Sequence, residues 1–276
     1  MGIEVYNFGN NLFNKMKQIT VLSLILFLCY SGQNFAQEYI EVEYERITYS
    51  KNNSSRSTYF KLYASKDLSV SRLESIGKRE ESSWGTKEDG SLTYTASASK
   101  PPVRDDLYVN VNKGTIQMVS TIRGTTQQIN DTPPSLNWHI TDESKEIGGY
   151  IAIKAEVTFR GRDFEAWFTP EIPISAGPWK LHGLPGMILE VNDKEGQYSW
   201  YARNIKYPAE FDSEILVVNP DEIDEELSLQ EALKQHLENQ AREDRLRQAR
   251  ASQQGYKIKT MYSGRESWLE RVYEWE

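Results

Sequence analysis

Hydrophobic and polar residues alternate along one short segment after another between Gln37 and about Val218. In YIEVEYERI, the side chains of Ile40, Val42 and Tyr44 alternate with glutamates, which is the period of two expected for a strand with one buried face. The same alternation is found in the segments STYFKLYAS, DLSVSRLES, DLYVNVN and TIQMVSTI. The pattern therefore predicts a series of strands, with no helix before residue 220.

Three pairs of these segments are joined by short turns. The first turn, NKG, ends at Gly114, the second has Gly161 at its bend, and the third runs from Lys194 to Gly196. Short turns join antiparallel neighbours, because parallel neighbours need a crossover of about a dozen residues or more. We therefore predict a mainly β (α+β) fold: a curved antiparallel sheet or half-open barrel with a C-terminal charged helix.

The composition changes after residue 220. Ser228 and Glu231 stand at the spacing of a capping box, and leucines recur every fourth residue from Leu229. We predict a charged helix over about residues 221–255. Residues 256–262 are then expected to form a strand, followed by a short aromatic tail that docks on the domain.

The N-terminal segment has the pattern of a secretory signal peptide. Lys17 follows Met16, a short apolar run comes next, and Ala36 offers a small residue for cleavage. The run is too short for a membrane-spanning helix, which needs about 20 residues. We predict that residues 1–36 are an upstream extension plus signal peptide, with the true start at Met16, and that residues 37–276 form one domain.

Cysteine content and charge exclude several kinds of site and partner. Cys29 is the only cysteine and lies inside the predicted signal peptide, after Leu28, where a lipid-attachment motif needs a small residue. A mature chain without cysteine has no disulfide, thiol nucleophile or thiolate metal site. The formal net charge of −8 argues against nucleic acid or an anionic membrane surface as a partner.

Few residues have a recognisable reactive pattern. His139, His182 and His236 are not spaced as metal ligands, and no HExxH, G-x-S-x-G or phosphate-binding motif is present. His182 is the most interesting of the three because it lies beside a glycine-rich turn. One alternative stays open: a metal-binding or metal-dependent hydrolytic protein in which His182 or His139 meets nearby carboxylates. The candidate carboxylates are Glu165, Glu190 and Asp193.

Charged residues also stand at the bend GRDFEAW, namely Arg162, Asp163 and Glu165. A pair of carboxylates can do acid–base work, but at a hairpin bend we expect these residues to be solvated.

The segment GPWKLHGLPGMILEV, residues 177–191, combines turn residues with an apolar tail. Pro185 and Gly186 suit the central positions of a type II turn, which demands a positive φ at the glycine. Gly183 would allow a close backbone approach. The uninterrupted apolar residues of MILEV predict a strand covered on both faces. We interpret the segment as a rigid corner before a central strand; the alternative is a ligand-binding or partner-binding loop braced by Trp179.

Residues 148–191 closely resemble the signature of the GLPGLI family, named for its Gly-Leu-Pro-Gly-Leu-Ile motif. Here the motif reads GLPGMI, and the preceding GGYIAIKAEVTFRGRDFEAWFTPEIP is similar to the family's upstream block. Many relatives have a cysteine where this chain has Ala152, so a thiol role does not transfer. The resemblance implies an exported protein of a family typical of Bacteroidetes, without an assigned activity, whose genes often lie near those of TonB-dependent receptors.

We therefore expect a non-enzymatic binding or interaction module of the periplasm or outer membrane, linked by the resemblance to TonB-dependent transport. Exported half-barrel sheets also look like lipoprotein carriers, which hold lipid in an apolar concavity. We expect no catalytic residue, metal or cofactor, no nucleic acid, and no membrane span after signal cleavage; the partner would be an apolar ligand or an envelope protein such as a TonB-dependent receptor. The candidate binding residues are Trp167, Trp179, His182 and Trp200, and the structural motif comprises Gly177, Pro178, Gly183, Leu184, Pro185, Gly186, Met187 and Ile188.

Overall fold

The computed structural model describes residues 38–50, 54–76, 84–86, 92–94, 104–122, 124–253 and 270–273. From Tyr39 onward they belong to one compact unit. The predicted signal peptide, Cys29 and the strand expected over residues 256–262 lie outside the described residues. The division into a signal peptide and a mature domain therefore stays a prediction.

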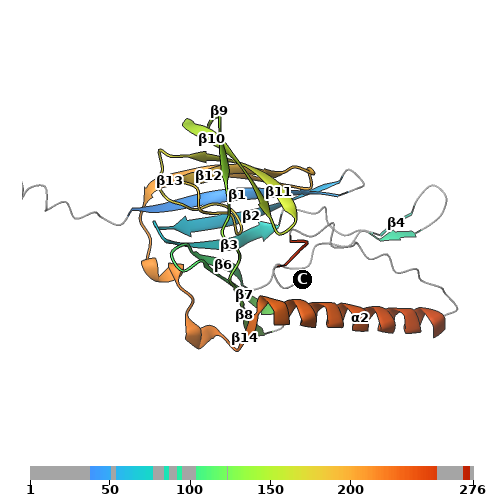
Figure 1. The fold of residues 1–276 in the computed structure, drawn as a ribbon. Coiled ribbons are helices and arrows are strands. Elements are labelled where there is room, and N and C mark those ends of the chain that lie inside the picture. The colour runs from blue at the N-terminus through green and yellow to red at the C-terminus, as the bar shows by residue number, and fades with distance from the viewer. Residues whose placement is uncertain are drawn as a thin grey trace, which may run out of the picture. The chain divides into compact units, whose positions relative to one another are not determined.

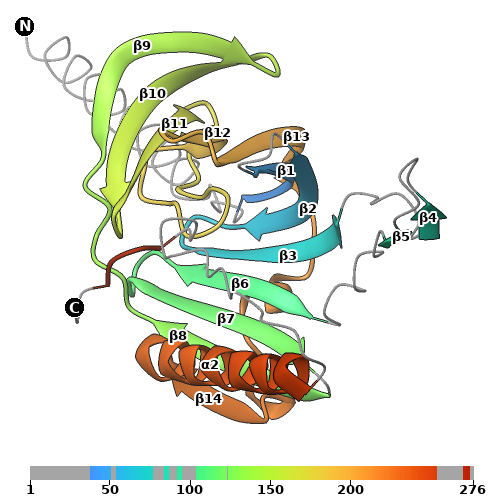
Figure 2. The ribbon, with the colours of Figure 1, turned by 90° about the vertical axis from the view of Figure 1, so that its right-hand side faces the viewer.

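In the part of the chain that the structure describes, twelve strands form one large, open, curved sheet (Figure 1, Figure 2). Their spatial order is β14-β8-β7-β6-β3-β2-β1-β13-β12-β11-β10-β9, and β4 and β5 pair separately. All neighbouring strands in the large sheet are antiparallel except β14 and β8. The bounds are β1 Tyr39–Tyr49, β2 Ser55–Ala64, β3 Leu68–Ile76, β4 Trp84–Thr86, β5 Leu92–Tyr94, β6 Asp105–Asn110, β7 Thr115–Ile122, β8 Thr125–Asp131, β9 His139–Ile147, β10 Tyr150–Phe159, β11 Arg162–Thr169, β12 Met187–Asp193, β13 Tyr198–Ala209 and β14 Glu225–Ser228.

The sheet confirms the mainly β prediction and the three predicted hairpins. The β6–β7 turn contains Gly114, the β10–β11 turn contains Gly161, and the β12–β13 turn contains Gly196. Their φ angles are 61°, 77° and 69°, a region that glycine enters without steric cost. Glycine at these positions therefore sets where the strands reverse.

The predicted helix over residues 221–255 is wrong at its N-terminal end. Residues 225–228 form β14, and helix α2 spans Leu229–Gln253. The free edge of β8 has backbone N–H and C=O groups without partners, and β14 pairs with this edge in parallel before the helix begins. The capping box is confirmed: the Ser228 N–H donates to Glu231 Oε2 at 2.9 Å, and the Glu231 N–H donates to Ser228 Oγ at 3.2 Å.

Residues 170–186, which connect β11 to β12, lie inside the curve of the sheet (Figure 2). We call the face that carries Val42 and Leu62 the inner face. Both side chains are buried in one cluster with Ile172 of the connection, and Leu181 of the same connection is buried in a second cluster. The connection therefore fills part of the hollow with the chain's own side chains.

Strand β12 is covered on both sides, as its apolar sequence predicts. Met187 and Leu189 belong to the first cluster, whereas Ile188 and Val191 belong to the second, and all four side chains are 0% exposed. A strand buried on both faces in this way is the least tolerant part of a sheet to polar substitution.

Two short 3-10 helices, η1 (Ser213–Leu216) and η2 (Pro220–Glu222), follow β13. The first corrects the expectation that no helix precedes residue 220. Leu216 is buried with Val70, Tyr108 and Val119 in a third cluster. These three strand residues alternate with the inner-face positions, so the segment that contains η1 covers the outer face.

Candidate functional site

The glycines of the GLPG corner have their predicted roles exchanged. Gly186 is absent from the residues with a positive φ, so the type II turn prediction is wrong. A Cβ on Gly186 would lie 2.1 Å from the Thr169 carbonyl oxygen, whereas Gly183 has φ +91° and a Cβ there would make only ordinary contacts with Trp138, at 3.8 Å or more. The Gly186 N–H donates to the Leu184 carbonyl at 2.8 Å, which closes a tight three-residue turn around Pro185.

Gly177 is also needed for a close approach. A Cβ there would lie 2.7 Å from both Ile188 Cδ1 and the Leu181 carbonyl oxygen. The corner is thus pressed against β11 at one end and β12 at the other. Its glycines are explained by packing, which supports the interpretation of a structural motif.

Trp179, a candidate binding residue, is part of the packed interior of the fold. It has φ +56°, in a turn closed by a Leu181 N–H to Pro178 carbonyl hydrogen bond of 3.3 Å. Its ring stacks on Trp200 with centroids 6.3 Å apart and an interplanar angle of 13°, and its centroid is 5.6 Å from that of Phe159. This contact braces the connection against the sheet.

Trp200 and Trp167, the other aromatic candidates, are buried, whereas Trp179 is half-buried. Trp200 is 1% exposed and Trp167 is 8% exposed. The Trp167 Nε1–H donates to Glu165 Oε1 at 3.1 Å, and Lys145 Nζ lies 4.2 Å from the centroid of a Trp167 ring. The four candidate binding residues therefore do not line one common open site.

The three histidines lie on separate elements. His139 begins β9, His236 lies on α2, and half-buried His182 lies in the β11–β12 connection. His182 Nδ1 is 2.9 Å from the Lys180 carbonyl oxygen, and the His182 carbonyl accepts a 2.8 Å hydrogen bond from Trp138 Nε1. Burial lowers the pKa of His182, and the hydrogen bond to the carbonyl offsets this only in part.

The carboxylates named for a metal site face cations instead. Glu190 pairs with Lys145 at 2.7 Å, Asp193 pairs with Arg162, and Glu165 lies 3.2 Å from Lys154. In the part of the chain that the structure describes, no group of three or more histidine, cysteine, aspartate or glutamate side chains could hold a metal ion. The metal-dependent alternative therefore has no ligand set among these residues.

The sequence analysis missed a buried cluster of four charges. Asp131 accepts hydrogen bonds from Arg160 Nη1 and Nη2 at 2.9 and 2.8 Å and from Lys180 Nζ at 2.8 Å. Glu270 Oε1 lies 2.6 Å from Arg160 Nη1 and 2.8 Å from Lys180 Nζ. Among the described residues, two cations face two anions here, so the cluster joins β8, the β10–β11 turn, the connection and the C-terminal residues.

The same turn corrects the expectation of a solvated bend. Arg160 and Gly161 both have a positive φ, 45° and 77°, which is typical of a two-residue type I′ turn. Arg162 is fully buried against Asp193 and lies with its guanidinium 5.0 Å from the Tyr198 ring centroid. Asp163 is exposed, as expected.

The C-terminal residues dock on this turn. The Arg271 and Val272 N–H groups both donate to the Arg160 carbonyl, at 2.9 and 3.2 Å. Tyr273 is buried, with its ring centroid 5.3 Å from the Arg160 guanidinium carbon. A docked aromatic tail is confirmed for residues 270–273.

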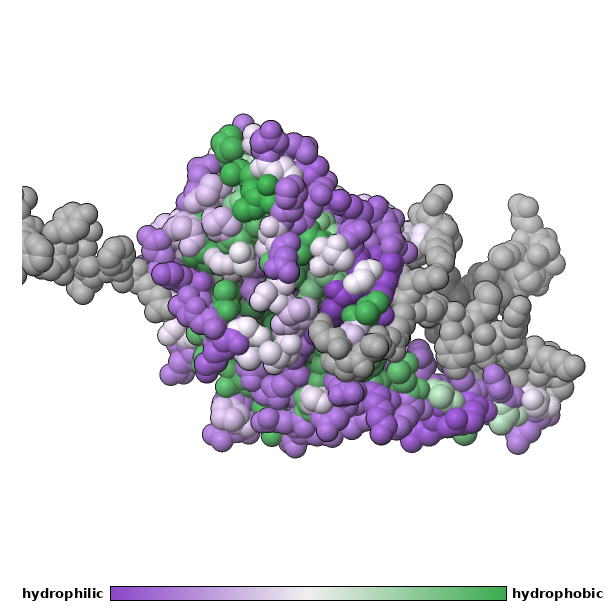
Figure 3. All heavy atoms as spheres, viewed as in Figure 1, coloured by the Kyte–Doolittle hydropathy of each residue, from purple (hydrophilic) through white to green (hydrophobic). Residues whose placement is uncertain are grey.

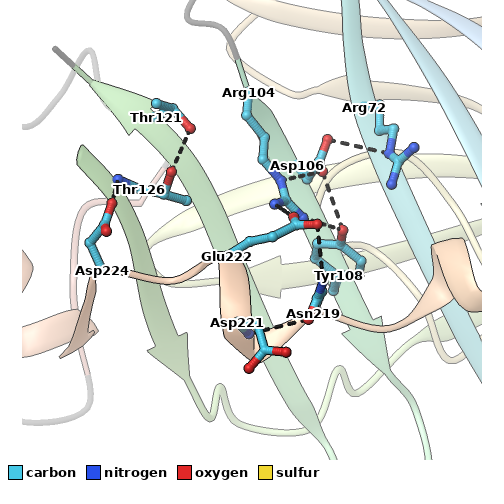
Figure 4. A network of polar contacts seen from close by, with 10 residues as sticks. All are labelled: Arg72, Arg104, Asp106, Tyr108, Thr121, Thr126, Asn219, Asp221, Glu222 and Asp224. Atoms are coloured by element: carbon cyan, nitrogen blue, oxygen red, sulfur yellow. Dashed lines mark hydrogen bonds and ion pairs between the residues drawn. The ribbon is translucent and has the colours of Figure 1, made fainter. Parts of the chain in front are cut away.

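A second polar network holds the outer-face segment in place (Figure 4). Arg104 donates to Asp106 Oδ2 and to the Tyr108 hydroxyl, both at 2.9 Å, and it also pairs with Glu222. On the next loop, Asp224 Oδ2 accepts from the Thr126 N–H at 2.7 Å. All of these groups have internal partners, so the network is explained by its structural role.

The inner face continues beyond the filled part of the hollow. The register aligns Leu62 with Ser71, and then Ser71 with Leu107, Met118 and Ile129 on successive strands. Leu107, Met118 and Ile129 are half-buried, and none belongs to the three clusters of described residues. On the same face, Val109 and Ile116 also belong to none of these clusters, but they are buried, so this apolar row is the more accessible part of β6 and β7.

The far edge of the sheet shows a different surface. Figure 3 has a hydrophobic patch over β9 and β10 on a face that is otherwise mostly hydrophilic. The exposed large hydrophobic residues of these strands are Ile140 and Ile151. Acidic residues on β9, including Asp142 and Glu143, discourage pairing of this edge with another strand.

Comparison with known proteins adds one family match. The family described as a protein of unknown function (Porph_ging) matches residues 158–190, which include β11, the connection and most of β12. The matched residues lie within residues 148–191, on which the GLPGLI resemblance depends. No protein in the curated set matches the chain.

Among solved structures, PNGF-II in the C2 space group is similar with a TM-score of 0.48 and 16% identity over 69% of this chain and 31% of that one. The chain thus spans about a third of the length of PNGF-II. The LolA superfamily protein NE2245 from Nitrosomonas europaea has a TM-score of 0.30 and 8% identity over 67% of this chain and 92% of that one. A putative outer membrane lipoprotein-sorting protein domain from Vibrio parahaemolyticus has a TM-score of 0.25 and 7% identity, covering 67% of this chain and 92% of its own.

Within the described residues, no helix is both long enough and apolar enough to span a membrane.

Proposed function

We propose that the protein is an exported, non-enzymatic binding module of the bacterial envelope that holds an apolar ligand on the inner face of its sheet. The observation that carries the proposal is the row formed by Leu107, Met118 and Ile129, which is apolar and only half-buried. Ligand sites are concave and mostly apolar, with a few polar groups that orient the ligand. The apolar row lies on the concave side of the curved sheet, beside the part of the hollow that residues 170–186 fill.

The proposed ligand surface differs from the one that the tryptophans suggested. Trp179 and Trp200 stack on one another, so they support the wall of the site from within the core. The connection, residues 170–186, would bound the ligand at one end, while the apolar row would contact its body. Export and a role beside a TonB-dependent receptor are supported by the N-terminal pattern and by the GLPGLI resemblance.

The proposal can be tested on protein exported to the periplasm from the full chain and purified without detergent. Native mass spectrometry would detect a retained apolar molecule, and titration with the neutral dye N-phenyl-1-naphthylamine would measure binding to the emptied protein. Met118→Gln or Ile129→Gln should weaken dye binding by about fivefold or more, because each removes apolar contact area worth roughly 1 kcal/mol when half-buried. Val217→Gln, at an exposed position that lies outside the sheet, is the matched control.

Equal dye affinity in all four proteins, together with ligand-free spectra from repeated preparations, would refute the proposed binding surface.

A further inference from the structure

Arg46 occupies an unusual place on the inner face. It lies on β1 directly opposite Thr58 of β2 and Trp200 of β13. On the same face of β1, Val42 and Tyr44 are buried in the first cluster. A charged side chain therefore follows two apolar ones on the side of the strand that faces the hollow.

The guanidinium of Arg46 lacks the partners that other arginines of the sheet have. Arg160 and Arg162 each pair with a buried carboxylate, and Arg203 pairs with Glu45. Among the described residues, Arg46 forms no ion pair, and its buried Nε has no hydrogen-bond acceptor. Its guanidinium carbon lies 5.0 Å from the centroid of the Phe60 ring.

An unpaired cation in such a place is costly. Burial lowers the pKa of Arg46, and the Coulombic effects of Tyr198 and Asp105 offset burial only in part. Arg46 is half-buried, and its Nε is the atom withdrawn from water without an acceptor. Partial removal of a guanidinium from water without a partner costs free energy, which a protein usually avoids by pairing the charge. An anion that enters from outside would supply the missing acceptor.

The surroundings indicate what such an anion would be attached to. Phe60 lies under the Arg46 guanidinium, Trp200 is the cross-strand neighbour of Arg46, and Tyr198 acts on its charge. Phe60 aligns with Leu73 of β3, two residues from Ser71, and Ser71 aligns with the apolar row. We infer that Arg46 binds the carboxylate or phosphate group of a ligand whose apolar body lies on the inner face. The inference rests on the proposed function for the position of the apolar body, and on Arg46 itself for the anionic group.

Isothermal titration calorimetry with dodecanoate, dodecanol and inorganic phosphate distinguishes an anionic group carried by an apolar ligand from a free anion. It also tests the inference about Arg46 separately from the proposed apolar surface. Wild-type protein should bind dodecanoate roughly tenfold to a hundredfold more tightly than dodecanol, because a charge-assisted hydrogen bond is stronger than a neutral one. Arg46→Met should bind the two equally, Arg46→Lys should retain part of the preference, and Arg203→Met should retain all of it. Phosphate binding that is lost only in Arg46→Met would support a free-anion source for the same site.

Equal affinity of the wild-type protein for dodecanoate and dodecanol, with no phosphate binding, would overturn the inference about Arg46 while leaving the proposed function intact. Binding of phosphate without either twelve-carbon ligand would instead support Arg46 and refute the apolar surface. A preference for dodecanoate that survives in Arg46→Met would also overturn the inference. Circular dichroism of each variant confirms that these comparisons are made on folded protein.

Discussion

The buried charge cluster gives the sharpest prediction for stability. Asp131 is 2% exposed at its side chain and accepts three hydrogen bonds, two from Arg160 and one from Lys180. Asp131→Asn removes the negative charge and leaves two buried cations with Glu270 as their only carboxylate in the cluster. Breaking a buried ion pair from one side costs about 3–5 kcal/mol. A domain of ordinary stability has only about 5–15 kcal/mol in total.

Urea unfolding followed by tryptophan fluorescence measures this loss at pH 7. The control is Asp142→Asn, because Asp142 is exposed on the edge strand β9 and should change stability little. The double variant Asp131→Asn/Lys180→Met removes one cation with the anion, so it should recover part of the loss. A free energy of unfolding within about 1 kcal/mol of wild type for Asp131→Asn would refute the reasoning, since it would mean that the cluster is not desolvated.

The same carboxylate predicts a pH dependence. Burial opposes ionisation of Asp131, but the hydrogen bonds from Arg160 and the charge of Lys180 outweigh it and lower the pKa of the carboxyl below its ordinary value. A lowered folded-state pKa contributes stability above the unfolded-state value of about 3.9, and that contribution is lost as the pH falls through the folded-state pKa. The difference between wild type and Asp131→Asn should therefore be largest near neutral pH and shrink in acid. A difference that stayed constant down to the acid transition would contradict this assignment.

Three further outcomes follow from the corner and the helix. Gly186→Ala should cost about 3 kcal/mol in urea unfolding because its Cβ would meet the Thr169 carbonyl, whereas Gly196→Ala, in open space at φ +69°, should cost only about 1 kcal/mol; equal losses would contradict the close approach. Trp179→Ala should lower the free energy of unfolding by roughly 3 kcal/mol, and an unchanged value would mean that its stack on Trp200 is not part of the core. Ser228→Ala should speed amide hydrogen exchange in the first turn of α2, and exchange at the wild-type rate would show that the capping box is not needed there.

Much of the fold can be predicted from local patterns. The alternation of Ile40, Val42 and Tyr44 predicts a strand with a buried face, and those residues are buried on the inner face of β1. Turn glycines such as Gly114 predict the hairpins because a positive φ is a property of one residue and its neighbours. The parallel strand β14 escaped prediction, because pairing with β8 depends on an edge that is almost a hundred residues away.

The candidate site was predicted less well. Gly183 was predicted to allow a close backbone approach and Gly186 to adopt a positive φ, but the structure shows the reverse. Both requirements are met by glycine, so the sequence alone does not distinguish them. Arg162 was expected to be solvated, since most charged residues at a bend are, whereas Asp193 buries it. Arg46 drew no notice, because the missing partner of a cation can be recognised only when its surroundings are known.

The sequence by itself determined most of the antiparallel strands, the three turns that reverse them, the capped start of the helix and the doubly covered β12, because each depends on the periodicity or conformational preference of adjacent residues. Only the tertiary structure decided that residues 170–186 fill the hollow and that Asp131, 29 residues from Arg160 and 49 from Lys180, neutralises both. The physical reason is that a buried charge has lost its hydration and is stable only beside an opposite charge. The curvature of the sheet decides which residues are close enough to provide it.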